Sequence, residues 1–157
     1  MQISTLIRYL FLLFLGCFTS KVSIAQNYVF RHLTTTNGML SDLRICLTED
    51  RIGRLWIGSE EGINVFDGYQ LSSYSKPDNS ALSDNNITNI FCDKQGTIWV
   101  STPSGVQYKK ENTNKFVSLK GDSLLFKDVS FFAETAQGDI VIVDAGIVYR
   151  VHEQRKI

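Results

Sequence analysis

The stretch "GRLWIGSEEGINVF", Gly53 to Phe66, returns further along the chain as "GTIWVSTPSGVQY", Gly96 to Tyr108. Four residues are identical in the two copies, and each pair is separated by 43 positions: Asp50 and Asp93, Gly53 and Gly96, Trp56 and Trp99, Gly62 and Gly105. Four conservative pairs keep the same register without a gap: Leu55 and Ile98, Ile57 and Val100, Ser59 and Thr102, Ile63 and Val106. An internal repeat of this period is typical of solenoids, propellers and other arrays.

A third, degenerate copy begins at Gly138 with "GDIVIVDAGIVYRV", 42 residues after Gly96. Val141 occupies the position of the tryptophan, Thr135 occupies that of the aspartate, and the loop before Gly146 is one residue shorter. The chain therefore carries three copies of one unit, and the third has lost the most recognisable side chains.

The local pattern of each copy predicts β-structure. "LRICLTE" alternates apolar and polar residues with a period of two, and "RLWIG", "INVF" and "YQLSSY" are short strand-like runs. Between them lie turn sequences, "DRIG", "SEEG" and Asp67-Gly68, that favour tight reversals. Four short antiparallel strands in about 43 residues are the module of a β-propeller blade. We expect an all-β fold of about three blades in an incomplete ring.

The first 25 residues have the anatomy of a secretory signal peptide. They contain no Asp or Glu, Arg8 supplies a positive charge, and Tyr9–Phe18 ("YLFLLFLGCF") is apolar. "SIA" (23–25) places small residues before a cleavage point between Ala25 and Gln26. Ten apolar residues are too few to cross a hydrocarbon core of about 30 Å, which argues against a membrane anchor. A lipoprotein acylated at Cys17 stays open as an alternative.

These boundaries give a signal peptide (1–25), a partial propeller (26–151) and a polar tail (152–157). Removing the signal takes away Arg8 and Lys21, so that 16 basic and 16 acidic residues become 14 and 16. A net charge near −2 offers no electrostatic reason to expect nucleic acid or anionic lipid as a partner. No segment after the signal is long or apolar enough to span a membrane.

Two cysteines remain in the mature chain. Cys46 lies four residues before Asp50, whereas Cys92 lies one residue before Asp93. Because this difference is odd, equivalent strands would direct the two thiols to opposite faces, and we expect both to be free and mostly buried. With His32 and His152 they are too few for a metal site, and we expect neither metal nor cofactor.

The repeated residues are interpreted first as structural. We expect Trp56 and Trp99 to pack between blades and not to stack on ligand. Asp50 and Asp93 head identical turns, where an aspartate bonds to its own backbone, and the four repeated glycines are turn residues. "SDNN" (83–86) lacks the ligand spacing of a calcium loop. The sequence contains no recognisable catalytic constellation and no nucleotide-binding glycine motif.

The pattern Asp-x-x-Gly-x-Leu/Ile-Trp-Ile/Val-Gly/Ser-Ser/Thr-x-x-Gly-Ile/Val resembles the two-component regulator propeller repeat. So does "GMLSD" (38–42), which is echoed in "ALSDNNITNIF" (81–91). The opening "YVFRHLTTTNGMLSD" (28–42) is similar to the start of the sensor region of bacterial hybrid two-component proteins. The resemblance covers about Tyr28 to Val151.

The resemblance implies periplasmic propellers that sense mostly oligosaccharides. In that family a sandwich domain, a transmembrane helix, a histidine kinase, a receiver and often a DNA-binding domain follow, and this chain contains none of them. We expect an extracytoplasmic ligand-sensing fragment of a phosphorelay sensor without kinase activity of its own. The expected partners are an oligosaccharide, the remaining blades of the propeller and, in the full-length inner-membrane protein, a second copy in a homodimer. A secreted propeller enzyme acting on polysaccharide and a protein-binding scaffold remain alternatives.

Two further expectations concern the two ends of the incomplete ring of blades. Tyr28–Thr34 has the character of a strand that pairs with a final blade to join the ends of the ring. At the other end, around Ile140–Val143, we expect an exposed inter-blade face, because closure would normally hide it.

Overall fold

The computed structural model describes residues 7, 32–76, 81–119 and 126–152. The chain divides into two units, Met1–His32 and Leu33–Ile157, and every strand reported below belongs to the second. Apart from residue 7, the predicted signal peptide lies outside the described residues, and so do residues 28–31 of the predicted closing strand Tyr28–Thr34. Among the helices that are described, none has the length and apolar character needed to cross a membrane.

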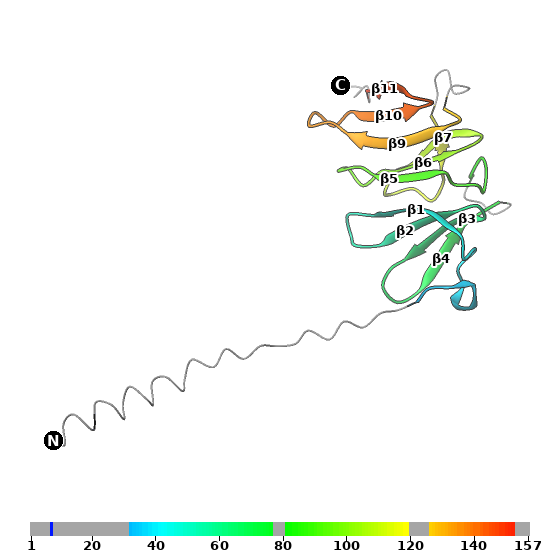
Figure 1. The fold of residues 1–157 in the computed structure, drawn as a ribbon, viewed down its shortest axis with the longest axis vertical. Coiled ribbons are helices and arrows are strands. Elements are labelled where there is room, and N and C mark those ends of the chain that lie inside the picture. Colours follow the sequence, from blue (N-terminus) through cyan, green and yellow to red (C-terminus); the bar gives the residue numbers. More distant parts are fainter. Residues whose placement is uncertain (1–6, 8–31, 77–80, 120–125, 153–157) are drawn as a thin grey trace. The chain divides into compact units, whose positions relative to one another are not determined.

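Three antiparallel sheets follow one another along the chain, as Figure 1 shows. After a short 3-10 helix, η1 (Thr35–Asn37), the first sheet contains β1 (Arg44–Glu49), β2 (Leu55–Ser59), β3 (Gly62–Phe66) and β4 (Leu71–Tyr74). The second contains β5 (Asn89–Cys92), β6 (Ile98–Thr102), β7 (Gly105–Lys109) and β8 (Val117–Ser118). The third contains β9 (Val129–Glu134), β10 (Ile140–Asp144) and β11 (Ile147–Val151). The predicted all-β fold of three blades is confirmed, and the ring is not closed.

Strand pairing reproduces the repeat in three dimensions. Within each sheet every strand pairs with the next in sequence, so each sheet is a meander. In the β2–β3 pair Trp56 lies opposite Val65, and in the β6–β7 pair Trp99 lies opposite Tyr108. Val141, which replaces the tryptophan, lies opposite Arg150 in the β10–β11 pair. The three copies therefore share one register, although the third sheet has three strands among the described residues.

The sheets stack face to face and bury two apolar interfaces. The first strands of successive sheets, β1, β5 and β9, contact one another in that order, as they do in a propeller. We call the packing between the first and second sheets the first interface; its buried core is Trp56, Ile63, Val65, Leu82, Ile87, Ile90, Ile98, Val100 and Phe116. The second interface, between the second and third sheets, is Trp99, Val106, Phe126, Val129, Phe132, Ile140 and Ile142.

Both cysteines are free and partly buried, but for a different reason from the one the sequence suggested. Cys46 pairs with Gly58 on the face of the first sheet that meets the second, and Cys92 lies on the opposite face of its own sheet. Because neighbouring blades stack front to back, opposite faces meet, and both thiols pack against the first interface. Facing opposite ways therefore does not separate them. Burial raises the pKa of Cys46 to about 12 and that of Cys92 to about 11, which keeps both thiols protonated.

Apolar side chains are exposed at both ends of the stack. On the third sheet Phe131 and Val148 are 57% and 67% exposed, on the face that carries Val141 and Val143. Ile140 and Ile142 point the other way and are buried in the second interface. The expected exposed inter-blade face is therefore present, and only alternate residues of Ile140–Val143 contribute to it. At the other end of the stack, Leu47 of β1 is also exposed, as are Leu43 just before β1 and Ile52 in the β1–β2 turn.

Candidate functional site

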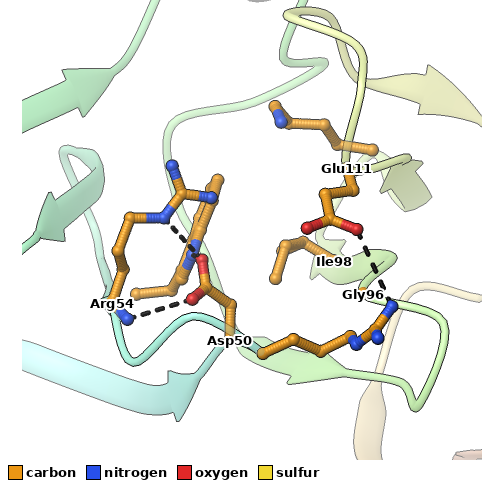
Figure 2. A pocket seen from close by; sticks show the side chains of 8 residues that line it. Asp50, Arg54, Gly96, Ile98 and Glu111 are labelled. Carbon is orange, nitrogen blue, oxygen red and sulfur yellow. Dashed lines mark hydrogen bonds and ion pairs between the residues drawn. The ribbon is translucent and has the colours of Figure 1, made fainter.

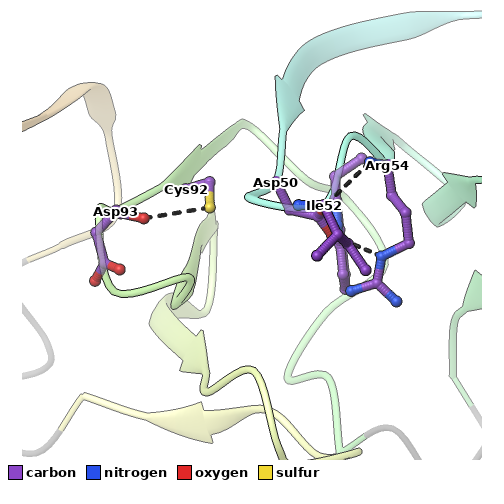
Figure 3. Close-up of polar contacts among 6 residues, drawn as sticks. Asp50, Ile52, Arg54, Cys92 and Asp93 are labelled. Atoms are coloured by element: carbon purple, nitrogen blue, oxygen red, sulfur yellow. Dashed lines mark hydrogen bonds and ion pairs between the residues drawn. The ribbon is translucent and has the colours of Figure 1, made fainter.

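The β1–β2 turn is held together by one carboxylate. Oδ1 of Asp50 accepts hydrogen bonds from the backbone N–H groups of Ile52 (3.1 Å) and Arg54 (3.0 Å). Oδ2 accepts from Nε of Arg54 at 2.7 Å, as Figure 3 shows, and from the indole Nε1 of Trp56 at 2.8 Å. Gly53 takes a φ of +84°, which closes the turn and favours glycine. Burial alone would raise the pKa of Asp50, but these four hydrogen bonds outweigh it and lower that pKa.

The second copy builds the same turn. Oδ1 of Asp93 accepts from the N–H groups of Gln95 and Thr97, and Oδ2 accepts from Nε1 of Trp99 at 2.9 Å. In the third copy Thr135 replaces the aspartate and Val141 the tryptophan, so the indole donor is gone. The single hydroxyl of Thr135 accepts from the N–H of Asp139 at 3.1 Å. The aspartate and the tryptophan that donates to it are thus both absent from the third copy, and the hydroxyl keeps one of the backbone contacts of the turn.

Two side-chain amides hold the segments that lead into the first two blades. Asn64 on β3 accepts from the N–H of Leu40 at 2.8 Å and donates to the carbonyl of Gly38. Gln107, 43 residues later on β7, accepts from the N–H of Ser83 at 2.7 Å and donates to the carbonyl of Ala81 at 3.1 Å. Both amides are buried. Sequence reasoning missed these clamps, although the 43-residue spacing of two amides was a visible signal.

The remaining repeated glycines lie at the opposite end of the strands. Gly62 and Gly105 begin β3 and β7, and their carbonyls accept from the hydroxyls of Ser59 and Thr102 at 3.0 and 3.1 Å. The eight motif residues therefore do not form one site. They recur as two turns in each blade, with the tryptophans in separate interfaces.

A pocket opens beside the Asp50 turn, between the first and second sheets (Figure 2). Its empty space is about 240 Å³, counting the open mouth. The residues that line it are Asp50, Arg51, Arg54, Trp56, Gly96, Ile98, Lys109 and Glu111. Sequence reasoning assigned Asp50, Trp56 and Gly96 a structural role and did not select the charged residues around them.

Lys109 is the unusual member of this pocket. It ends β7, is 4% exposed, and holds its ammonium 5.5 Å from the centroid of the Trp56 ring. Among the described parts of the chain, no group lies within hydrogen-bond or ion-pair distance of this ammonium. Burial, followed by the charge of Arg54, lowers the pKa of Lys109. The first copy has Phe66 at the equivalent position, so a lysine ending an apolar strand was the signal available in the sequence.

The other charges of the pocket are paired with each other. Arg54 binds Asp50 and also lies over the Trp56 ring, with its guanidinium carbon 5.7 Å from the centroid. Arg51 and Glu111 form an exposed ion pair of 3.8 Å across the mouth. Both acids therefore have a closer cationic partner than Lys109, and among the described residues none forms a direct ion pair with its ammonium.

A second charged cluster lies at the end of the third sheet. Asp139 is 3% exposed and contacts Arg150 and Nδ1 of His152. The hydrogen bond to His152 is the main cause that lowers the pKa of Asp139. No group of three or more potential metal ligands gathers anywhere in residues 32–76, 81–119 and 126–152.

Comparison with known proteins connects this fold to sensors. Residues 81–104 match the family model described as the two-component regulator propeller. Over 56 residues, which are 35% of this chain and 4% of the relative, the sequence is 36% identical to histidine kinase P4 of Formosa agariphila. The chain thus contains a two-component regulator propeller repeat, and it spans a small part of the length of this relative.

Solved structures with a similar fold include an extracellular domain of a two-component system. The fold is similar to the extracellular domain of BT3049, named as a hybrid two-component system of B. thetaiotaomicron, with a TM-score of 0.63 and 25% identity. That match covers 71% of this chain and 17% of the other. Virginiamycin B lyase from Staphylococcus aureus is similar with a TM-score of 0.53 and 14% identity, over 71% of this chain and 38% of the enzyme. At that identity the likeness shows a shared fold alone.

Proposed function

We propose that this chain is part of the extracytoplasmic sensor of a hybrid two-component system and that the sensor recognises an oligosaccharide. The observation that carries the proposal is the shared Asp–Trp turn in two successive blades, together with the likeness to the extracellular domain of such a system. In this role the blades form a rigid recognition module. Phosphoryl transfer belongs to a kinase elsewhere in the full-length protein.

The exposed faces of the stack agree with a module that is completed by other blades. Phe131 and Val148 occupy the face which, on the preceding sheets, is covered by the next sheet. Loops from several blades hold ligands at the mouth of a propeller, so these three sheets offer part of an oligosaccharide site. In the full-length protein, anchorage in the inner membrane and a homodimer would complete the signalling unit.

Export is tested with an alkaline phosphatase fused after Ile157, because the reporter is active only outside the cytoplasm. We expect high phosphatase activity, and we expect it to be lost when residues 1–25 are deleted. Equal activity with and without these residues would contradict an extracytoplasmic sensor.

The signalling role is tested on the gene and on the protein. An in-frame kinase coding region downstream supports the sensor. A stop codon after further blades would favour the alternatives, a secreted polysaccharide-degrading propeller or a protein-binding scaffold.

A panel of pectic, mannan and glycosaminoglycan oligosaccharides then separates binding from catalysis. Saturable binding without cleavage products supports sensing, whereas shortened products would identify an enzyme.

A further inference from the structure

We propose that the pocket between the first and second sheets binds a small oxyanion, a carboxylate or sulfate group, with the Lys109 ammonium as its principal contact. The proposal stands on the geometry and charges of this pocket. It holds whether or not the protein is a sensor, and it concerns a different place from the mouth of the propeller.

The side chains of the pocket carry an excess of positive charge. Three cationic side chains, Arg51, Arg54 and Lys109, meet two carboxylates, Asp50 and Glu111. Asp50 already accepts four hydrogen bonds, two of them from Arg54, and Glu111 faces Arg51. The Lys109 side chain is 4% exposed, but its ammonium still reaches the solvent of the pocket and has no hydrogen-bond or ion-pair partner among the described residues. An incoming anion would supply that partner.

The walls position Lys109 for this contact. The ring of Trp56, itself 1% exposed, lies beside the ammonium and contributes a cation–π interaction that leaves the N–H donors available. Arg54 gives its Nε to Asp50, and in the part of the chain that the structure describes its Nη groups have no hydrogen-bond partner. An anion beside Lys109 would therefore meet a second donor group at the rim.

Size and access restrict what can enter. The 240 Å³ of the pocket includes open solvent at its mouth, and the enclosed part has room only for a very small group. Gly96 lets the side chains of Arg51 and Glu111 lie close to the backbone, because a Cβ at this position would lie 3.1 Å from Cδ of Arg51 and from Oε2 of Glu111. Only a single small charged group can reach Lys109 here, whereas a run of sugar rings cannot.

The test uses the full chain, titrated at constant ionic strength with chloride as the exchanging anion. The probes are sodium acetate, sodium sulfate, sodium glucuronate and neutral glucose, and the readouts are Trp fluorescence and the NMR signal of the Lys109 ε-methylene. We expect saturable binding of the anions and none of glucose. Tighter binding of glucuronate than of acetate would identify a sugar-borne carboxylate, whereas equal binding would identify the free ion.

Matched variants assign the site. Lys109→Met keeps the length of the side chain and removes its charge, and should weaken anion binding about 10- to 100-fold, the range of a charged hydrogen bond. Lys115→Met makes the same change on an exposed residue outside the pocket and should leave affinity unaltered. Glu111→Gln removes a repelling carboxylate from the mouth and should strengthen binding several-fold.

Two results would overturn the proposal: unchanged anion affinity in folded Lys109→Met, or no saturable response of the native chain up to about 100 mM anion. Circular dichroism and urea unfolding establish whether Lys109→Met folds. If it does not, the NMR signal of the Lys109 ε-methylene in the native chain decides: no saturable shift of this signal with added anion would overturn the proposal.

Discussion

The indole Nε1 of Trp56 donates a 2.8 Å hydrogen bond to Oδ2 of Asp50, six residues earlier in the chain. The bond joins the β1–β2 turn to the centre of β2 and fixes the ring against the first interface. One tryptophan therefore stabilises both a local turn and the packing between blades. The pair recurs as Trp99 and Asp93, which explains why both residues return at the same spacing.

Replacing Trp56 or Trp99 separates these two contributions. Trp56→Ala and Trp99→Ala should each lower the free energy of unfolding by about 3–5 kcal/mol, because a buried aromatic site is emptied. Trp56→Phe keeps most of the packing and loses the hydrogen bond, so we expect a smaller cost of about 1–3 kcal/mol. Urea unfolding measures all three, with the exposed Ile52→Ala as a control that should change stability little. Full stability in both alanine variants together with lost ligand binding would show that the tryptophans are binding residues.

Asp50 should make stability depend on pH in the acid range. Its hydrogen bonds hold the folded-state pKa below the ordinary value of 3.8. The resulting stabilisation is fully present above the unfolded-state pKa and is lost as the pH falls through the lowered folded-state pKa. Urea midpoints recorded from about pH 6 to about pH 2 should therefore fall less steeply for Asp50→Asn than for the native chain. Parallel curves would mean that Asp50 is not responsible.

The amide clamp of Gln107 should control exchange of the backbone that it holds. Gln107→Leu preserves the approximate size of the side chain and leaves the N–H of Ser83 and the carbonyl of Ala81 without their partner. We expect a loss of about 1–3 kcal/mol and much faster hydrogen exchange at the Ser83 amide. Gln95→Leu, at an exposed glutamine of the same sheet, is the control and should leave that exchange rate unchanged.

The β10–β11 turn offers a stabilising substitution. Ala145 and Gly146 form a two-residue loop with φ values of +47° and +80°, and Ala145 is one of two non-glycine residues with positive φ among those described. Asparagine tolerates this conformation better than alanine does, and Asn-Gly is a preferred pair in such turns. Ala145→Asn should raise stability by about 0.5–1 kcal/mol, a typical gain for a locally optimised residue. Ala145→Val should lower stability, since a β-branched residue is strained there. A stabilising valine would rule out this account of the turn.

The N-terminus of the exported protein is predicted to be Gln26, because "SIA" places small residues before the cleavage point. N-terminal sequencing of the product recovered from the periplasm checks this. Recovery of Met1 would contradict cleavage. A lipid-modified N-terminus at Cys17 would support the lipoprotein alternative.

The sequence by itself determined the blades. The Asp-x-x-Gly turn, the alternation of apolar residues and the 43-residue spacing act within a few residues of one another, so they predicted β2, β3, β6 and β7 and the register between copies. These signals are local: a hydrogen bond from an aspartate to the next turn, or a glycine at positive φ, has the same cause in any tertiary context.

Only the tertiary structure decided what meets between blades. Strand parity correctly put Cys46 and Cys92 on opposite faces, yet front-to-back stacking brought both to one interface. The same stacking placed Lys109 of the second sheet beside Trp56 and Arg54 of the first, with no direct ion pair to its ammonium among the described residues. Contacts of this kind join residues of different blades, such as Lys109 and Trp56, and no periodicity along the chain encodes them. These contacts depend on how the side chains of two neighbouring sheets fit together, and that fit is determined by both facing surfaces at once.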